Sequence, residues 1–417
     1  MNIQICAVGS HGDVLPFIAL GREFRRRGHA PRVFANAAFE HLAKEADLEF
    51  TATGSSSDMS AHLGNPDSTD PMRGMALLAK AMMRSVEQSY PLLCREFDPG
   101  NTVVVASSLA WSARLLSETH QAPCTVVHLA PSWFRSEHVA PSIGPLGHLA
   151  RAPRFVKRWA FKAMDRRFLD PLFTIPFNRV RVGLGLAPVE HTFDAWLHQT
   201  DLVLGLFPDW FAPRQPDWPK QLELHGFPLY DHGQEAPLSS EVTAFMAAGA
   251  APILFTAGTA NASSHAFFSA SAEACRISGH RAILLAQDVR QVPETMSEEV
   301  AHFSYIPFQA LLPQVAAIVH HGGIGTTSQA LLAGIPQLIR PMGFDQFDNA
   351  LRAVKLGVAK QLMPRRYGPQ SAARALIALT SDDQIRERCA VVARQTAASR
   401  GVQGCCDAIL RLRPRMV

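Results

Sequence analysis

The sequence predicts an α/β protein made of two doubly wound, Rossmann-like domains that face a central cleft. Short apolar runs alternate with longer amphipathic stretches, as in βαβ units around a parallel sheet. The alternation restarts after the polar, Pro-containing stretch YDHGQEAPLSS, and 417 residues with 47% hydrophobic content can form two buried cores. We expect a first domain at 1–230, a linker at 231–240, a second domain at 241–395, and a C-terminal helix at 396–417 that could return to the first domain.

In the first domain, strands are expected in NIQICAV, PRVFAN, LEFTATG, TVVVASS and TVVHLAP. Amphipathic stretches between them predict helices, among them a long one over 72–97. In the second domain, strands are expected in PILFTAG, RAILLAQ, AAIVHH and PQLIRP. Both sheets should therefore be parallel, with helices on both faces.

Composition excludes several classes of protein. A net charge of +4 is too small to indicate a nucleic-acid partner. The seven cysteines are scattered and form no Cys-x-x-Cys pair, which is typical of reduced thiols in the cytoplasm. We expect no leader in the opening MNIQICAVGSHGD, and no window of the sequence is apolar enough to span a membrane.

A glycine-rich loop carries the strongest signal. In AAIVHHGGIGTTSQALLAGIP, a buried strand ends at His320, passes through His321, Gly322 and Gly323, and opens a helix near Ile324. Exposed backbone N–H groups and the positive helix end suit a diphosphate, and His321 can add a donor. An ordinary tight turn would explain the glycines alone.

Polar residues follow the next strand as well. In PQLIRPMGFDQFDNALR, Asp345 and Gln346 come just after the strand and should lie beside the glycine loop at the same sheet edge. Their carboxylate and amide groups suit sugar hydroxyls. Asp345 could equally be a helix N-cap, and the two roles are compatible.

The run HHGGIGTTSQALLAGIPQLIRPMGFDQFDNA resembles the nucleotide-sugar glycosyltransferases of the GT-B fold, of the family that includes UDP-glycosyltransferases, antibiotic glycosyltransferases and sterol glucosyltransferases. Together with the opening GSHGDVLPFIAL, it most resembles the rhamnosyltransferases that form rhamnolipids. This implies a hexosyltransferase of rhamnolipid (glycolipid biosurfactant) biosynthesis that uses dTDP-L-rhamnose and a 3-(3-hydroxyalkanoyloxy)alkanoic acid. A partner protein could supply that lipid acceptor.

The resemblance also implies roles for individual residues. The donor diphosphate would contact the glycine loop and the loop after the second domain's first strand, and the sugar would contact Asp345 and Gln346. The nucleoside would lie against SYIPFQALL. The residues concerned are Gly258, Thr259, His321, Gly322, Gly323, Gly325 and Thr326 for the diphosphate, and Tyr305, Ile306, Phe308 and Gln329 for the nucleoside.

Gln329 departs from the family pattern. Many members have a Glu there, which accepts hydrogen bonds from two ribose hydroxyls. An uncharged Gln329 is compatible with a deoxyribose, and hence with a dTDP sugar, although Gln can also bond a ribose.

In the first domain, GSHGDVLPFIAL lies after the first strand, at the sheet edge where α/β proteins bind ligands. The resemblance makes Asp13 the general base that deprotonates the acceptor. The alternative is a helix N-cap before Val14, with Pro16 in the first turn. His11 is a second candidate base or a loop residue.

No Asp-x-Asp run is present to chelate Mg²⁺, so we expect no metal and no other cofactor. The helix end, His321 and Thr326 would then stabilise the leaving diphosphate. A single displacement with inversion of the anomeric centre follows.

The segment 151–181 contains nine Lys or Arg and two Asp, a net charge of +7, interleaved with Phe, Trp, Leu and Met. Such a segment can lie on an anionic membrane surface, here the inner membrane, or form a solvated helix with its aromatics in the core. Trp133 and Phe134 could line an apolar acceptor channel or belong to the core.

Other functions are alternatives to a glycosyltransferase. A nicotinamide-dependent oxidoreductase would need a Gly-x-Gly-x-x-Gly loop, which GSHGD lacks. A sugar-nucleotide epimerase shares the fold but has no need for Asp13. A non-catalytic binding partner is a further alternative, and UDP-glucose with a sterol or polyketide aglycone is the competing substrate pair.

Overall fold

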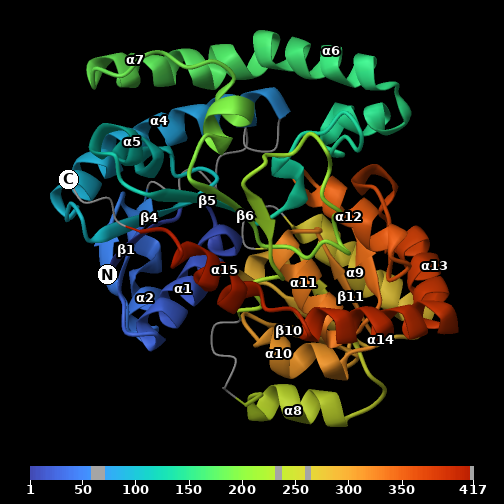
Figure 1. Cartoon of the computed structure of the whole chain (residues 1–417). Coiled ribbons are helices and arrows are strands. Elements are labelled where there is room, and N and C mark those ends of the chain that lie inside the picture. Colours follow the sequence, from blue (N-terminus) through green and yellow to red (C-terminus); the bar gives the residue numbers. More distant parts are fainter. Residues whose placement is uncertain (58–70, 231–236, 259–263, 414–417) are drawn as a thin grey trace. The chain divides into compact units, whose positions relative to one another are not determined.

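The computed structural model describes residues 1–57, 71–230, 237–258 and 264–413. The chain forms two compact units, one made of Met1–Pro228 with Arg400–Val417 and the other of Leu229–Ser399. Each unit contains a parallel sheet with helices on its faces (Figure 1). The predicted fold class of two doubly wound α/β units is confirmed. Of the expected linker 231–240, residues 231–236 lie outside the described residues.

The first unit has a seven-stranded sheet in the order β3-β2-β1-β4-β5-β6-β7. Every neighbouring pair is parallel, and β1 lies between β2 and β4. The strands are β1 (Asn2–Cys6), β2 (Ala30–Ala35), β3 (Glu49–Ala52), β4 (Thr102–Ser107), β5 (Cys124–His128), β6 (Leu202–Gly205) and β7 (Leu222–Leu224).

The helices of this unit follow the predicted alternation. The expected long helix over 72–97 is present as α4. The α-helices are α1 (His11–Arg26), α2 (Glu40–Glu45), α4 (Pro71–Arg95), α5 (Trp111–His120), α6 (Arg154–Met164), α7 (Ile175–Gly183) and α15 (Gly401–Ile409). The 3-10 helices are η1 (Ala37–Phe39), η3 (Pro131–Trp133) and η4 (Gly144–Arg151). The π-helices are η5 (Asp165–Thr174) and η6 (Thr192–Trp196).

The C-terminal helix α15 belongs to the first unit although it ends the chain. It packs on α1, where Arg27 forms an ion pair with Asp407 at 2.6 Å and Cys406 Sγ lies 3.8 Å from the Leu20 carbonyl oxygen. The chain therefore returns to its first helix after completing the second unit.

The second unit has a six-stranded parallel sheet in the order β10-β9-β8-β11-β12-β13. The strands are β8 (Ile253–Thr256), β9 (Ala282–Leu285), β10 (Val300–Phe303), β11 (Ala317–His320), β12 (Gln337–Ile339) and β13 (Ala359–Gln361). The helices are α8 (Ser240–Ala247), α9 (His265–Ser278), α10 (Phe308–Leu311), α11 (Ile324–Ala333), α12 (Gln346–Lys355), α13 (Pro369–Thr380) and α14 (Asp383–Ala397), with η7 (Val289–Gln291), η8 (Leu312–Gln314) and η9 (Pro364–Arg366).

All nine strands expected from the sequence are present, and four were missed: β6, β7, β10 and β13. Three of them, β7, β10 and β13, contain polar or charged residues and have no continuous buried run, so no apolar pattern marks them, whereas β6 is a buried apolar run that was overlooked. All four lie at or next to the edges of their sheets.

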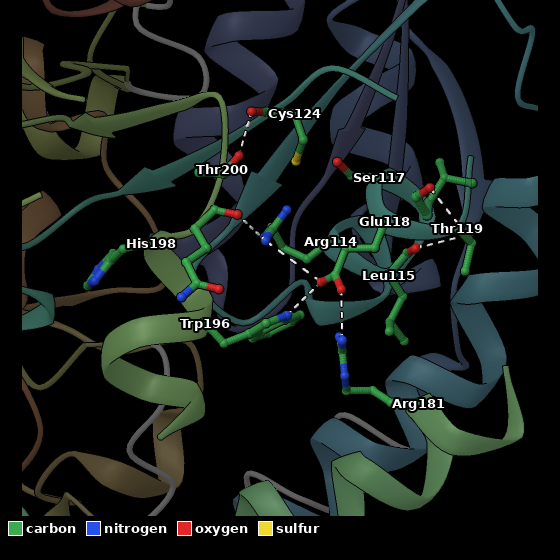
Figure 2. A network of polar contacts seen from close by, with 12 residues as sticks. Arg114, Leu115, Ser117, Glu118, Thr119, Cys124, Arg181, Trp196, His198 and Thr200 are labelled. Atoms are coloured by element: carbon green, nitrogen blue, oxygen red, sulfur yellow. Dashed lines mark hydrogen bonds and ion pairs between the residues drawn. The ribbon is translucent and has the colours of Figure 1, made fainter. Parts of the chain in front are cut away.

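A long helical rod made of α6, η5 and α7 covers part of the first unit (Figure 1). One partly buried carboxylate, Glu118 on α5, anchors its end. Glu118 accepts a hydrogen bond from Trp196 Nε1 at 2.6 Å and pairs with Arg181 of α7 at 2.8 Å, while Arg114 lies 3.8 Å away (Figure 2). Both arginine side chains are only 4% exposed, so the pairing fixes the orientation of α7.

Candidate active site

The glycine loop of the second unit adopts the predicted strand-to-helix turn. β11 ends at His320, Gly322 has a φ of +92°, and α11 begins at Ile324 with Gly323 as its N-cap. Within the described part of the chain, no side chain caps this helix end. Gly325 and Thr326 lie in its first turn, so the backbone N–H groups of this turn are oriented to bind an anion.

The ring of His321 occupies a space that two glycines leave open. A Cβ atom on Gly258 would lie 2.5 Å from His321 Cε1, and one on Gly323 would lie 2.5 Å from His321 Nε2. Gly258 also has a φ of +81°. The structure thus brings together Gly258 and His321, two of the predicted diphosphate residues, whereas Thr259 lies outside the described residues.

Burial lowers the pKa of His321 to about 4, so its imidazole is neutral at pH 7. Its Nδ1 atom is buried and has no hydrogen-bond partner among the residues that the structure describes. His321 can therefore offer a phosphate oxygen one neutral N–H donor, while the attraction for negative charge comes from the helix end.

A chain of hydrogen bonds connects the glycine loop to Asp345. The Gly322 N–H donates to His320 Nδ1 at 3.1 Å, and His320 Nε2 lies 3.0 Å from Gln337 Oε1. The Gly322 carbonyl accepts from Asn349 Nδ2 at 3.0 Å, and the same amide donates to Asp345 Oδ2 at 2.8 Å. Both polar groups of the Gly322 peptide are thus held by buried side chains.

This arrangement determines which ring nitrogen of His320 carries the proton. Because Nδ1 accepts from a backbone N–H, Nε2 must donate to Gln337. Burial, followed by the nearby His321, lowers the pKa of His320 to about 3, which keeps it neutral and in this form.

Asp345 and Gln346 lie at the start of α12, as the sequence predicted. Asp345 occupies the N-cap position of α12, as expected, but its side chain makes no capping hydrogen bond. The expected position is confirmed, and the expected capping by the side chain is wrong. Gln346 Oε1 accepts from the backbone N–H groups of Met342 and Gly343 at 2.8 and 3.1 Å. These bonds order the loop and leave the Gln346 amide nitrogen as its remaining donor group.

The predicted nucleoside residues differ in exposure. Ile306 is 2% exposed, and Phe308 is partly buried against the same core cluster. Tyr305 is 51% exposed. Gln329 is 6% exposed, and its Nε2 donates to the Tyr230 carbonyl at 3.4 Å. Tyr305 is therefore the most exposed of the three candidates in this segment.

In the first unit, α1 begins at His11 and not near Val14, so the alternative reading of Asp13 as an N-cap is wrong. Ser10 is the N-cap, and Asp13 is the third residue of the helix in a capping box. Asp13 Oδ2 accepts from the Ser10 N–H at 2.8 Å and from Ser10 Oγ at 2.9 Å. Burial raises the pKa of Asp13 above the ordinary 3.8, and the two Ser10 bonds oppose that rise.

Three further predicted residues of this unit lie near its aromatic side chains. The His11 ring packs edge-on against Phe39 at 5.0 Å. Trp133 stacks on His128 at 5.7 Å, and Phe134 is 1% exposed. Phe134 belongs to the core and also lines a cavity of about 310 Å³, with Arg135, Asp194, Ala195, His198, Gln199, Asp217, Pro219 and Gln221.

Sequence reasoning did not identify His320 or Asn349 as site residues. Asn349 lies four residues after Asp345, and side chains at this spacing lie on one face of a helix, so its contact with Asp345 could have been anticipated. Its contact with Gly322, 27 residues away, could not. Among the described residues, no group of three or more His, Cys, Asp or Glu side chains could hold a metal ion.

Comparison with protein families gives two matches in chain order. Residues 3–139 match the glycosyltransferase family 28 N-terminal domain. Residues 275–408 match the C-terminal domain of erythromycin biosynthesis protein CIII-like proteins. The first match contains Asp13, and the second contains the glycine loop and Asp345.

Related proteins match along the whole chain. The O-mycaminosyltylonolide 6-deoxyallosyltransferase of Streptomyces fradiae is 27% identical over 97% of this chain and 96% of its own length. The sterol 3-beta-glucosyltransferase of Yarrowia lipolytica is 23% identical over 99% of this chain but only 29% of its own length.

Solved structures match the fold. The glycosyltransferase of kitacinnamycin superposes with a TM-score of 0.75, at 21% identity over 98% of both chains. The spinosyn rhamnosyltransferase SpnG, solved with thymidine diphosphate, has a TM-score of 0.66, at 16% identity over 98% of this chain and 100% of its own.

Two parallel-sheet Rossmann-like units of this kind form the fold of the matching GT-B glycosyltransferase structures. The two domain matches and the full-length relatives show that the chain is a glycosyltransferase, and its fold is that of GT-B glycosyltransferase structures. Within the described residues, no helix is long and apolar enough to cross a membrane.

Proposed function

We propose that the enzyme transfers a hexose with inversion, without a metal ion, from a nucleoside diphosphate sugar to the hydroxyl of a lipophilic acceptor. The observation that carries this proposal is the hydrogen-bonded connection between the glycine loop and Asp345. It holds an anion-binding helix end and a carboxylate suited to sugar hydroxyls in one rigid arrangement. A nucleoside diphosphate sugar needs both features side by side.

On the donor side, the diphosphate binds at the first turn of α11. Its N–H groups and the neutral His321 donate hydrogen bonds to the oxygens that gain charge as the sugar leaves. The same diphosphate oxygens are surrounded by Gly258, Gly323, Gly325 and Thr326. Asp345 Oδ1 and the Gln346 amide nitrogen hold the sugar hydroxyls, and Tyr305 lies against the base.

On the acceptor side, Asp13 acts as the general base. Ser10 fixes one carboxylate oxygen, Oδ2, and thereby orients the other toward its substrate. The acceptor oxygen forms a bond to the anomeric carbon as the bond to the diphosphate oxygen breaks, and the hydroxyl proton passes to Asp13. A raised pKa makes the carboxylate a stronger base for this step.

For the particular substrates, we propose dTDP-L-rhamnose and a 3-(3-hydroxyalkanoyloxy)alkanoic acid, with a mono-rhamnolipid as product. The resemblance of the two motifs to rhamnolipid-forming enzymes supports this choice. The likeness to a deoxysugar transferase and to a rhamnosyltransferase that binds thymidine diphosphate agrees with it. Such an enzyme works in the cytoplasm, and a partner protein can supply its lipid.

The second candidate is a UDP-glucose-dependent glucosyltransferase that acts on a sterol or another lipophilic aglycone. The similarity to sterol 3-beta-glucosyltransferases favours it. Gln329 does not discriminate between the two donors, because its amide is directed toward the Tyr230 carbonyl.

Thermal stabilisation by dTDP and by UDP tests the donor, since a ligand that binds only the folded state raises the unfolding temperature. A larger shift with dTDP supports the deoxysugar donor, and a larger shift with UDP supports the glucosyltransferase. Transfer is then measured with each donor in the presence of EDTA. Conversion of the nucleotide sugar into its epimer in the absence of an acceptor would contradict the transferase and indicate an epimerase.

A further inference from the structure

The rod of α6, η5 and α7 exposes a row of large apolar side chains. Phe155 and Trp159, one helical turn apart on α6, are 73% and 72% exposed. Further along, apolar side chains that are about half exposed continue the row: Phe168, Ile175 and Val182. Aromatic side chains this exposed are unusual on a protein that is surrounded only by water.

The other face of the same rod is fixed to the first unit. Phe161, Phe173 and Phe177 are buried, each at most 8% exposed. Arg135 forms an ion pair with Asp165 at 2.8 Å and lies over the Phe161 ring. The rod therefore already packs on the core through one row of side chains, Phe161, Phe173 and Phe177, and the exposed apolar row is a separate one.

The charges of the rod are segregated in the same way. Within residues 151–183, all of which the structure describes, both acidic side chains are turned away from solvent: Asp165 is 7% exposed and Asp170 is 21% exposed. The exposed residues include seven cations, namely Arg151, Arg154, Arg158, Lys162, Arg166, Arg167 and Arg179. Next to the rod, Glu137 pairs with Arg158, and the remaining cations outnumber it.

We propose that this face, defined by Phe155, Trp159 and the seven exposed cations, docks the enzyme on a membrane surface rich in anionic lipids. The cations bind lipid phosphates, and Phe155 and Trp159 insert into the headgroup region, as in amphipathic helices that lie in a membrane interface. The proposal rests on the proposed function for its purpose, because a lipophilic acceptor is concentrated in such a membrane.

Co-sedimentation with vesicles tests the docking. We expect the intact protein to bind vesicles that contain phosphatidylglycerol, to bind pure phosphatidylcholine vesicles weakly, and to be released by salt. Combined substitution of Phe155→Ser and Trp159→Ser, or of Lys162→Glu and Arg166→Glu, should reduce binding about tenfold or more. Val289→Ser is the matched control, since Val289 is 63% exposed and lies in the other unit.

Equal vesicle binding by the intact protein and the two double variants would overturn the proposal, as would absence of binding to anionic vesicles. Transfer to a short-chain acceptor dissolved below its micelle concentration separates docking from catalysis. The double variants should retain this activity. If they lose it to the same extent as vesicle binding, the face contacts the acceptor or a partner protein and the membrane proposal fails. Vesicle binding by a protein without transferase activity would instead refute only the proposed function.

Discussion

The side-chain amide of Asn349 joins Asp345 to the glycine loop, the two halves of the proposed donor site. It donates to Asp345 Oδ2 at 2.8 Å and to the Gly322 carbonyl at 3.0 Å, and the residue is fully buried. Gly322 is in turn held through its N–H by His320. The position of the Asp345 carboxylate therefore depends on the conformation of the glycine loop.

Replacing Asn349 by Ala should release both Gly322 and Asp345. Loss of a buried hydrogen-bonding group costs about 1–3 kcal/mol, so we expect affinity for the nucleotide sugar to fall about tenfold or more. Titration calorimetry with dTDP alone and with the dTDP sugar checks this. Asp345→Ala is the comparison: it should weaken only the sugar nucleotide, whereas Asn349→Ala weakens both. Unchanged dTDP affinity in Asn349→Ala would contradict the role of Gly322.

Asp13→Asn should reduce kcat about 10²-fold or more, because the acceptor hydroxyl then lacks its general base. Donor affinity should be unchanged. In the parent enzyme, kcat/KM should fall with decreasing pH along a limb that lies above the ordinary aspartate pKa of 3.8. A variant that loses dTDP affinity together with activity would show that Asp13 has a structural role.

Asp13→Asn should also change the free energy of unfolding. Folding raises the pKa of Asp13, so the folded state binds this proton more tightly than the unfolded state does. The unfolding free energy therefore falls as pH rises from 3.8 through the raised value. Asn cannot ionise, so at neutral pH Asp13→Asn should unfold at the same or a higher temperature than the parent.

Gly258→Ala should abolish donor binding, because the new Cβ would lie 2.5 Å from the His321 ring. Backbone strain at φ +81° adds about 1–2 kcal/mol of destabilisation. Gly279→Ala is a matched control, since Gly279 has φ +70° and nothing lies within 4 Å of its added Cβ. Gly279→Ala should lose only the stability that backbone strain costs, Gly258→Ala should lose more because its Cβ also meets the His321 ring, and only Gly258→Ala should lose dTDP affinity. Equal dTDP affinity in the two variants would place His321 outside the donor site.

His320 should make stability depend on pH. Its pKa falls from 6.5 to about 3 on folding, so the unfolded state binds the proton more tightly between these values. The unfolding free energy should therefore decrease as pH falls below 6.5, by about 2 kcal/mol at pH 5 from this residue. Denaturant unfolding at several pH values measures the slope. His320→Gln should flatten it, and an unchanged slope would mean that other groups dominate.

The sequence by itself determined the order of the main elements and the place of the glycine loop in the proposed donor site. Apolar runs of sufficient length marked nine strands, and glycines followed by a helix-forming stretch located the loop at His321 to Gly323. These features are local, because each depends on residues that are neighbours in the chain. The short strand β7 and the start of α1 were not determined in this way, since the boundaries of short elements depend on what packs against them.

Tertiary structure alone decided how side chains are oriented and paired. Gly322 and Asn349 are 27 residues apart, and Gln329 and Tyr230 are 99 residues apart, so no local pattern reveals their hydrogen bonds. Packing buried Ile306 and left Tyr305 exposed. In the same way it buried Asp165 and left Trp159 exposed. The physical reason is that partners and solvent exposure are set by packing between elements, which residue types along the chain do not specify.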